Sequence, residues 1–187
     1  MPISMYQASV PICIHVLKNL SAILKKGAAH AEAKKIDSAV LAGCRLYPDM
    51  FPLTRQVQIA SDTAKGCGAR LSGIEVPKFP DNETTIPELI KRVDKTIAFL
   101  NKLKARQIDG TEQKKITLEF PQLTLEFTGV QYLLGFVLPN LYFHLTTAYN
   151  ILRHNGLEIG KRDFLGAAPV PRRPAAARRK LGKKKVR

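Results

Sequence analysis

Apolar residues between Met50 and Ile74 recur at alternating spacings of three and four positions, and this pattern constrains the fold more than any other feature of the sequence. The residues concerned are Met50, Leu53, Val57, Ala60, Ala64, Cys67, Leu71 and Ile74. Such spacing places them in one seam along a helix that packs in a left-handed bundle. The segment 50–74 therefore predicts a bundle helix, with Asp49 as its N-cap.

The segments on either side of this helix predict a further long helix before it and a loop after it. Apolar residues recur every three or four positions over 6–31, which predicts a long helix. Pro11 either kinks it or lies in the first turn of a helix that begins near Ser9. A short amphipathic segment follows at 36–41. The Pro-rich segment 73–82 predicts a loop long enough to cross the end of a bundle.

Capping-box patterns open the remaining two helices. Thr85 and Glu88 precede a buried stripe that ends near residue 100, and Thr128 and Gln131 open a helix that runs to Gly156. Between them, 116–120 and 123–127 alternate apolar and polar residues, which predicts a β-hairpin. The predicted fold class is all-α, a four-helix bundle with a small β-hairpin between the third and fourth helices.

Basic charge is concentrated at the C-terminus. The chain carries 30 Lys and Arg against 15 Asp and Glu, a net charge of +15. Nine cations lie after residue 167 with no acid among them, so the preceding residues carry only +6. They are Arg172, Arg173, Arg178, Arg179, Lys180, Lys183, Lys184, Lys185 and Arg187. We therefore divide the chain into a bundle domain, 1–166, and a basic tail, 167–187.

This tail is too poor in apolar residues to fold, so we expect it to be disordered. Three functions stay open for it: a solubilising extension, a phosphate-binding arm or, in a eukaryote, a nuclear import signal. Nucleic-acid binding through the nine cations would lack sequence preference, because the tail offers no aromatic platform.

The expected location is intracellular. Three cysteines, Cys13, Cys44 and Cys67, form no CxxC motif, which favours a reducing compartment. The N-terminus lacks the basic region of a signal peptide. The longest apolar run, 132–138, continues to residue 143 only across Pro139 and Asn140, and this is shorter than the roughly 20 residues that a membrane-spanning helix needs. We expect a cytoplasmic protein, or a nuclear one in a eukaryote, that does not contact a membrane.

Candidate site residues lie on the second and fourth long helices. With Leu141 as the centre of the inner face, Leu134 projects inward and His144 lies about 60° away. Pro139 removes a helical hydrogen bond one turn before His144, and Gln56 shares the inner side of the second helix. This arrangement could hold a small ligand.

Structural roles are open for the same side chains. His144 is also explained as a core histidine, Gln56 as a structural amide and Tyr149, on the flank of the fourth helix, as interface packing. The other histidines, His15, His30 and His154, are predicted to face solvent. The sequence contains no HExxH, P-loop, GxSxG or dinucleotide-binding motif.

Several motifs resemble those of the DUF1993 family, the domain of unknown function nineteen-ninety-three, over residues 1–166. They are Ser4 to Pro11, Met50 to Leu53 with Gln56-Val57 and Ala60 to Asp62, Tyr142 to His144, Ala148-Tyr149, Ile151 to Gly156 and Gly160 to Gly166. That family is grouped with the DinB/YfiT-like bundles. The resemblance implies an up-down-down-up bundle, in which many members hold a metal on three histidines, one from the second helix and an HxxxH pair on the fourth.

This chain departs from the metal pattern. Positions 140 and 148 are Asn and Ala, and the second long helix contains no His. We therefore expect no metal and no cofactor, and the superfamily's thiol-transferase and hydrolase chemistries are not carried over, so the question of enzymatic activity stays open. Two functions remain: a bundle that binds a small molecule near His144, or an interaction module whose tail binds nucleic acid or another acidic partner. A homodimer is also left open.

Overall fold

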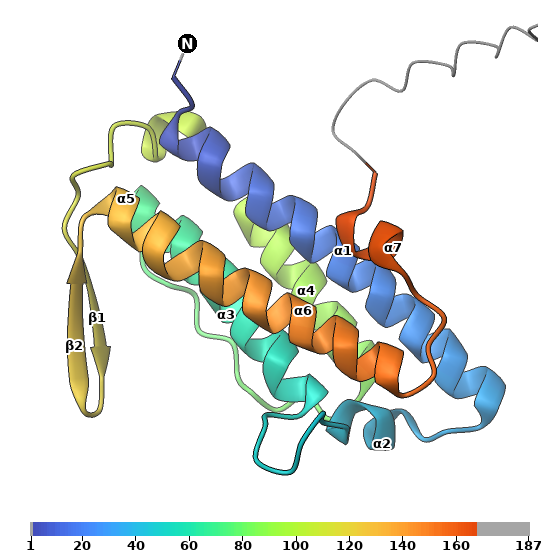
Figure 1. Ribbon diagram of the computed structural model, residues 1–187. Helices are drawn as coiled ribbons and strands as arrows, with labels where there is room; N and C mark the ends of the chain where they lie inside the picture. The colour runs from blue at the N-terminus through green and yellow to red at the C-terminus, as the bar shows by residue number, and fades with distance from the viewer. Residues whose placement is uncertain (1, 168–187) are drawn as a thin grey trace, which may run out of the picture.

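The computed structural model describes residues 2–167, and Figure 1 shows a bundle of four long helices with a hairpin at one side. The elements are α1 (Met5–Lys34), α2 (Ser38–Gly43), α3 (Leu53–Ser72), α4 (Ile86–Leu100), a short 3-10 turn η1 (Ala105–Gln107), β1 (Ile116–Phe120), β2 (Leu123–Phe127), α5 (Gly129–Gln131), a π-helical turn η2 (Tyr132–Val137), α6 (Leu138–His154) and α7 (Lys161–Leu165). The predicted disorder after residue 167 lies outside the described residues.

Helices α1 and α6 run in one direction and α3 and α4 in the opposite one, which is the up-down-down-up arrangement (Figure 1). At the start of α1, the Tyr6 N–H donates to the Asp109 carboxylate, which follows the end of α4. At the start of α4, the Ile86 N–H donates to the Ser38 hydroxyl, which follows the end of α1. The predicted fold class is confirmed. The loop between α3 and α4 was expected to cross one end of the bundle, but because these two helices are parallel it runs along the length of the bundle (Figure 1).

Helix α1 begins at Met5, earlier than one of the two predicted starts. Ser4 caps it by accepting from the Gln7 N–H. Pro11 lies inside the helix on its exposed side, where water reaches the carbonyl that proline leaves without a helical donor. By length and composition α1 is apolar enough to cross a membrane, but half of its most apolar 18-residue stretch is buried inside the bundle. It is the core helix of the fold.

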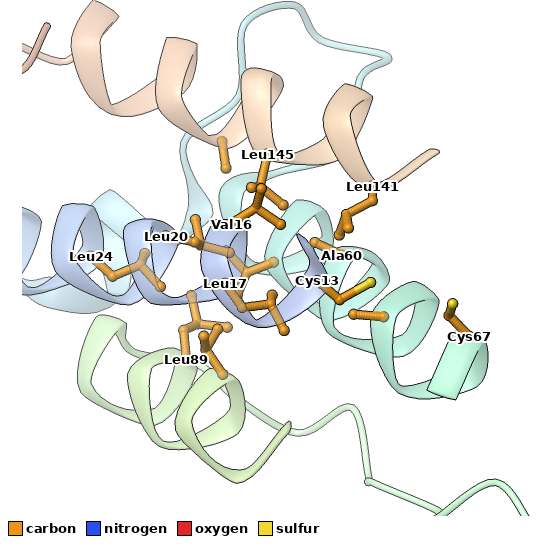
Figure 2. Packing of buried hydrophobic residues seen from close by; sticks show 14 of the residues in the cluster. Cys13, Val16, Leu17, Leu20, Leu24, Ala60, Cys67, Leu89, Leu141 and Leu145 are labelled. Carbon is orange, nitrogen blue, oxygen red and sulfur yellow. The ribbon is translucent and has the colours of Figure 1, made fainter. Parts of the chain in front are cut away.

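Small residues on α3 let its neighbours approach closely. Ala60, Ala64 and Cys67 are fully buried, and Figure 2 shows Ala60 and Cys67 with Cys13, Leu17 and Leu141 in the packed interior. The predicted N-cap, Asp49, was wrong: it is exposed, and Pro52 holds the N-cap position. Pro52 fixes the extended backbone ahead of Leu53, and the Leu53 N–H is already bound by the Cys44 carbonyl.

The crossover loop between α3 and α4 is held by a buried arginine. The side chain of Arg92 is 1% exposed, and its Nη2 lies 2.9 Å from both Asp62 and Asp81. Its Nη1 lies 3.0 Å from Glu83 and donates to the Pro80 carbonyl. These contacts fasten the loop that contains residues 80–83 to α3 and α4.

The predicted hairpin is confirmed, and the structure gives the register that the sequence left open. Ile116 faces Phe127 and Phe120 faces Leu123 across a two-residue turn. The chain then enters α5 at Gly129, where a Cβ atom would lie 2.0 Å from the carbonyl oxygen of Thr111. Only glycine leaves room for this contact between two backbone segments.

The fourth long helix starts with a π-helical turn. The Leu138 N–H donates to the Leu133 carbonyl, five residues back, and Pro139 follows without an N–H to offer. The Asn140 side chain donates to the Phe136 carbonyl at 2.7 Å. Leu134, predicted to point inward, is 56% exposed, because the π turn shifts the residues before Leu138 around the helix axis.

The C-terminal segment folds back onto α1. His15 donates from Nε2 to the Leu165 carbonyl at 2.9 Å, and Asn19 donates to the Phe164 carbonyl at 3.0 Å. His15 and His30, predicted to face solvent, are only partly exposed, because His15 binds the Leu165 carbonyl and His30 lies beside Gly156. His154 is exposed, as predicted.

Candidate functional site

A groove of about 680 Å³ opens between α3, β1 and the turn η2. Its polar lining includes Arg55, Asp62, Thr63, Arg70, Glu119, Tyr132 and Asn140. Its apolar walls are formed by Ile59, Leu118, Phe120 and Phe136. The groove thus combines apolar surface with a few polar groups, which is typical of small-molecule sites, and the π turn that carries Tyr132 is a feature frequent at functional sites.

Arg70 is held over one end of this groove by two neighbours. Its Nη1 donates to the Tyr132 hydroxyl at 3.2 Å, and its guanidinium lies 6.0 Å from the centre of the Tyr132 ring. The side chain folds back over Gly66, where a Cβ atom would lie 2.2 Å from Nη1. The guanidinium can take this position only because residue 66 has no side chain.

The buried side chains of Gln56 and His144 meet across the interface of α3 and α6. The Gln56 Nε2 donates to the Phe51 carbonyl at 3.1 Å, which turns the amide oxygen toward His144 Nδ1, 2.7 Å away. Because an amide oxygen only accepts, this pairing assigns the proton to Nδ1. In the neutral ring, Nε2 then carries a lone pair.

Burial, and then the positive charge of Arg55, lower the pKa of His144 below its ordinary value of 6.5. The imidazole is therefore neutral at pH 7 and can act as an acceptor or a base through Nε2. Asn140, which lines the groove, lies one helical turn before His144 on α6. The histidine itself is 8% exposed and is not among the residues that line the groove.

The third predicted site residue lies elsewhere. The Tyr149 hydroxyl is 3.4 Å from the Ile159 carbonyl, and its ring packs edge-on against Phe164. It lines a separate cavity of about 190 Å³ beside α7. The structure thus brings Gln56 and His144 together and places Tyr149 with the C-terminal segment. The nine basic residues of the tail lie outside the described residues.

Sequence reasoning missed the groove residues Arg70, Tyr132 and Asn140. Arg70 reads as an ordinary charged residue near a helix end, and its partner Tyr132 is 62 positions away. The available signals were local ones. Gly66 lies one turn before Arg70 in the interior of a helix, where glycine is unfavourable, and Pro139 marks the disturbed backbone that precedes Asn140.

Comparison with known proteins assigns this bundle to the DinB-like class. The crystal structure of a DinB family member protein from Shewanella denitrificans superposes with a TM-score of 0.81 at 43% sequence identity, over 90% of this chain and 95% of that chain. The family model described as Domain of unknown function (DUF1993) matches residues 5–165. The chain therefore belongs to the DUF1993 family, which confirms the resemblance found in its motifs. A search of the curated proteins found no match.

The three-histidine metal set of the wider superfamily does not fit the side chains of this chain. Helix α3 contains no histidine, and Asn140 and Ala148 occupy the positions one turn to either side of His144. Within residues 2–167, no three His, Cys, Asp or Glu side chains lie close enough together to hold a metal ion. An amide and a single imidazole are a poor divalent-metal site.

Proposed function

We propose that this DUF1993 protein binds a small molecule in the groove between α3, β1 and η2. The observation that carries the proposal is the Arg70 guanidinium, which is held at the groove by Tyr132 and Gly66. A cation fixed in this way can orient a ligand, and the apolar walls beside it supply the contact area.

His144 belongs to the same region without lining the groove. Asn140 lies one turn away on α6, and Arg55, which lines the groove, acts electrostatically on the imidazole. We place the ligand against Arg70 and Asn140, with the Gln56–His144 pair behind them. This location differs from a pocket centred on His144, because the imidazole is covered by its own neighbours.

A fragment screen observed by protein NMR tests the proposal. Compounds that bind are expected to shift the backbone amides of α3, β1 and η2 that border the groove. Thr63→Phe should block these compounds, because position 63 lines the groove and is only half-buried. Thr146→Phe, on the exposed side of α6, is the matched control. Binding that survives Thr63→Phe, or that maps only to other surfaces, contradicts the proposal.

The second candidate function is binding of nucleic acid through the basic tail. The observation that favours it is the run of nine cations without an acid after residue 167. Affinity for a DNA or RNA duplex of random sequence should fall steeply with salt, because each neutralised phosphate releases counterions. A chain that ends at Ala167 should lose this affinity and keep its thermal midpoint within a few degrees. Retained binding by the truncated chain contradicts this function.

A further inference from the structure

Arg70 forms no ion pair with any carboxylate of residues 2–167. The titratable groups on which its charge acts are the Tyr132 phenol and the Cys67 thiol. Burial raises the pKa of Tyr132 to about 12, so the phenol is neutral at pH 7. A hydrogen bond with the Cys13 thiol, together with burial, raises the pKa of the Cys67 thiol as well. A half-buried cation therefore faces the groove with only neutral groups beside it.

Tyr132 adds a second donor at the same end of the groove. Its oxygen accepts from Arg70 Nη1, which leaves the phenolic proton for another acceptor. The guanidinium also keeps N–H groups that its single bond to Tyr132 does not use. This end of the groove is rich in donors and carries one positive charge.

The two acids that line the groove do not neutralise Arg70. Asp62 lies 2.7 Å from Lys65 and 2.9 Å from Arg92, so its charge is already shared by two cations. Glu119 is exposed on the hairpin wall. The Glu119 carboxylate repels an anion of higher charge, and this favours a monoanion over a phosphate dianion at Arg70.

The rest of the groove is suited to an apolar group. Ile59, Leu118, Phe120 and Phe136 line its walls, and Phe136 stacks with Tyr132 at a ring-centre distance of 5.9 Å. A molecule that reaches Arg70 with a charged end would lay its body along these side chains.

We propose that the groove recognises a small organic acid, with its carboxylate on Arg70 and the Tyr132 hydroxyl and its apolar body against Ile59 and Phe136. The planar guanidinium matches a carboxylate with two parallel N–H donors. This inference rests on the proposed function, because it specifies the ligand class of the same groove.

Benzoate and its neutral isostere benzamide are the probes, titrated into the full-length chain and observed by NMR. Benzoate should shift the amides around Arg70 and Tyr132, and benzamide should bind at least about tenfold more weakly, because it lacks the charge-assisted bonds. Arg70→Met should abolish this difference, and Tyr132→Phe should reduce it. Arg106→Met is the control, since Arg106 is exposed and has no side-chain hydrogen bond or ion pair with the described residues.

The two probes separate this inference from the function on which it rests. Equal binding of benzamide and benzoate in the groove leaves small-molecule binding intact and overturns carboxylate recognition. Tighter binding of inorganic phosphate than of benzoate also overturns it, as does a failure of benzoate to bind at millimolar concentration. A groove that binds no fragment in the wider screen refutes the proposed function itself. The comparison of two probes on the native chain does not depend on whether the Arg70 variant folds.

Discussion

Replacement of Arg92 by methionine removes the cation that fastens the crossover loop to the bundle. Breaking a buried ion pair by removing one partner costs about 3–5 kcal/mol. The cost should be smaller here, because Asp62 and Asp81 are 40% and 39% exposed and regain water. Glu83, 12% exposed, is the carboxylate that loses most. The buried Nε–H of Arg92 has no acceptor within the described structure, so its removal is favourable.

These contributions together predict a loss of about 2 kcal/mol for Arg92→Met. Asp62 keeps Lys65 and Asp81 keeps Arg55 as partners, which limits the electrostatic penalty. For a chain of this length the midpoint of thermal unfolding should fall by about 4–8 °C. Urea unfolding measures the free energy, with Lys91→Met as the matched control, since Lys91 is the exposed neighbour of Arg92 on α4.

The control should change the free energy of unfolding by no more than about 0.5 kcal/mol. Limited proteolysis adds a local measurement, because the variant should be cleaved faster within residues 73–85. An Arg92→Met chain that is as stable as the control, and is cleaved no faster in this loop, would refute the reasoning that the arginine holds the crossover.

Three further predictions concern the histidine pair, a backbone contact and metal. The protein should unfold more easily as pH falls below 6.5, because His144 binds a proton more readily in the unfolded chain than in the folded one. Gln56→Glu should raise the pKa of His144 above 6.5 and reverse the contribution of His144 to this pH dependence. An NMR titration of this variant that still gives a value below 6.5 contradicts the assigned pairing. Gly129→Ala should destabilise by about 1–3 kcal/mol, since its Cβ meets the Thr111 carbonyl, whereas Gly135→Ala has open space and should cost nothing in urea unfolding. Elemental analysis of the purified protein should find no stoichiometric zinc, nickel or iron, and about one metal per chain would contradict the donor-set argument.

The helices and the caps of α4 and α5 were predictable because their signals are local, whereas the N-cap of α3 was not. The Glu88 carboxylate accepts from the Thr84 and Thr85 N–H groups, and the Thr128 hydroxyl accepts from the Gln131 N–H, as the capping-box spacing predicts. Each motif spans about one turn, so no distant part of the chain is needed to recognise it. The hairpin follows in the same way from two alternating segments separated by two residues.

Contacts between distant helices were predictable only in part. Helical projection placed Gln56 and His144 on inner faces, and the structure pairs them although they are 88 positions apart. The same method gave no reason to join Arg70 to Tyr132, because Arg70 reaches its partner by folding over Gly66. The conformation of a long, half-buried side chain depends on the space that its neighbours leave in the folded protein. This space cannot be worked out from a single sequence.

The backbone at the start of α6 explains why the groove could not be predicted from the sequence. Projection at 100° per residue assumes an unbroken α-helix, and it is correct after Pro139, where Leu141, Leu145 and Leu152 are all buried. Val137, just before Pro139, is also buried as projected, but earlier in the π turn the buried position moves by one residue, from Leu134 to Leu133. The same π turn carries Tyr132 and Phe136, both of which line the groove. The departure from α-helical geometry that makes the projection incorrect therefore also positions two residues of the candidate site.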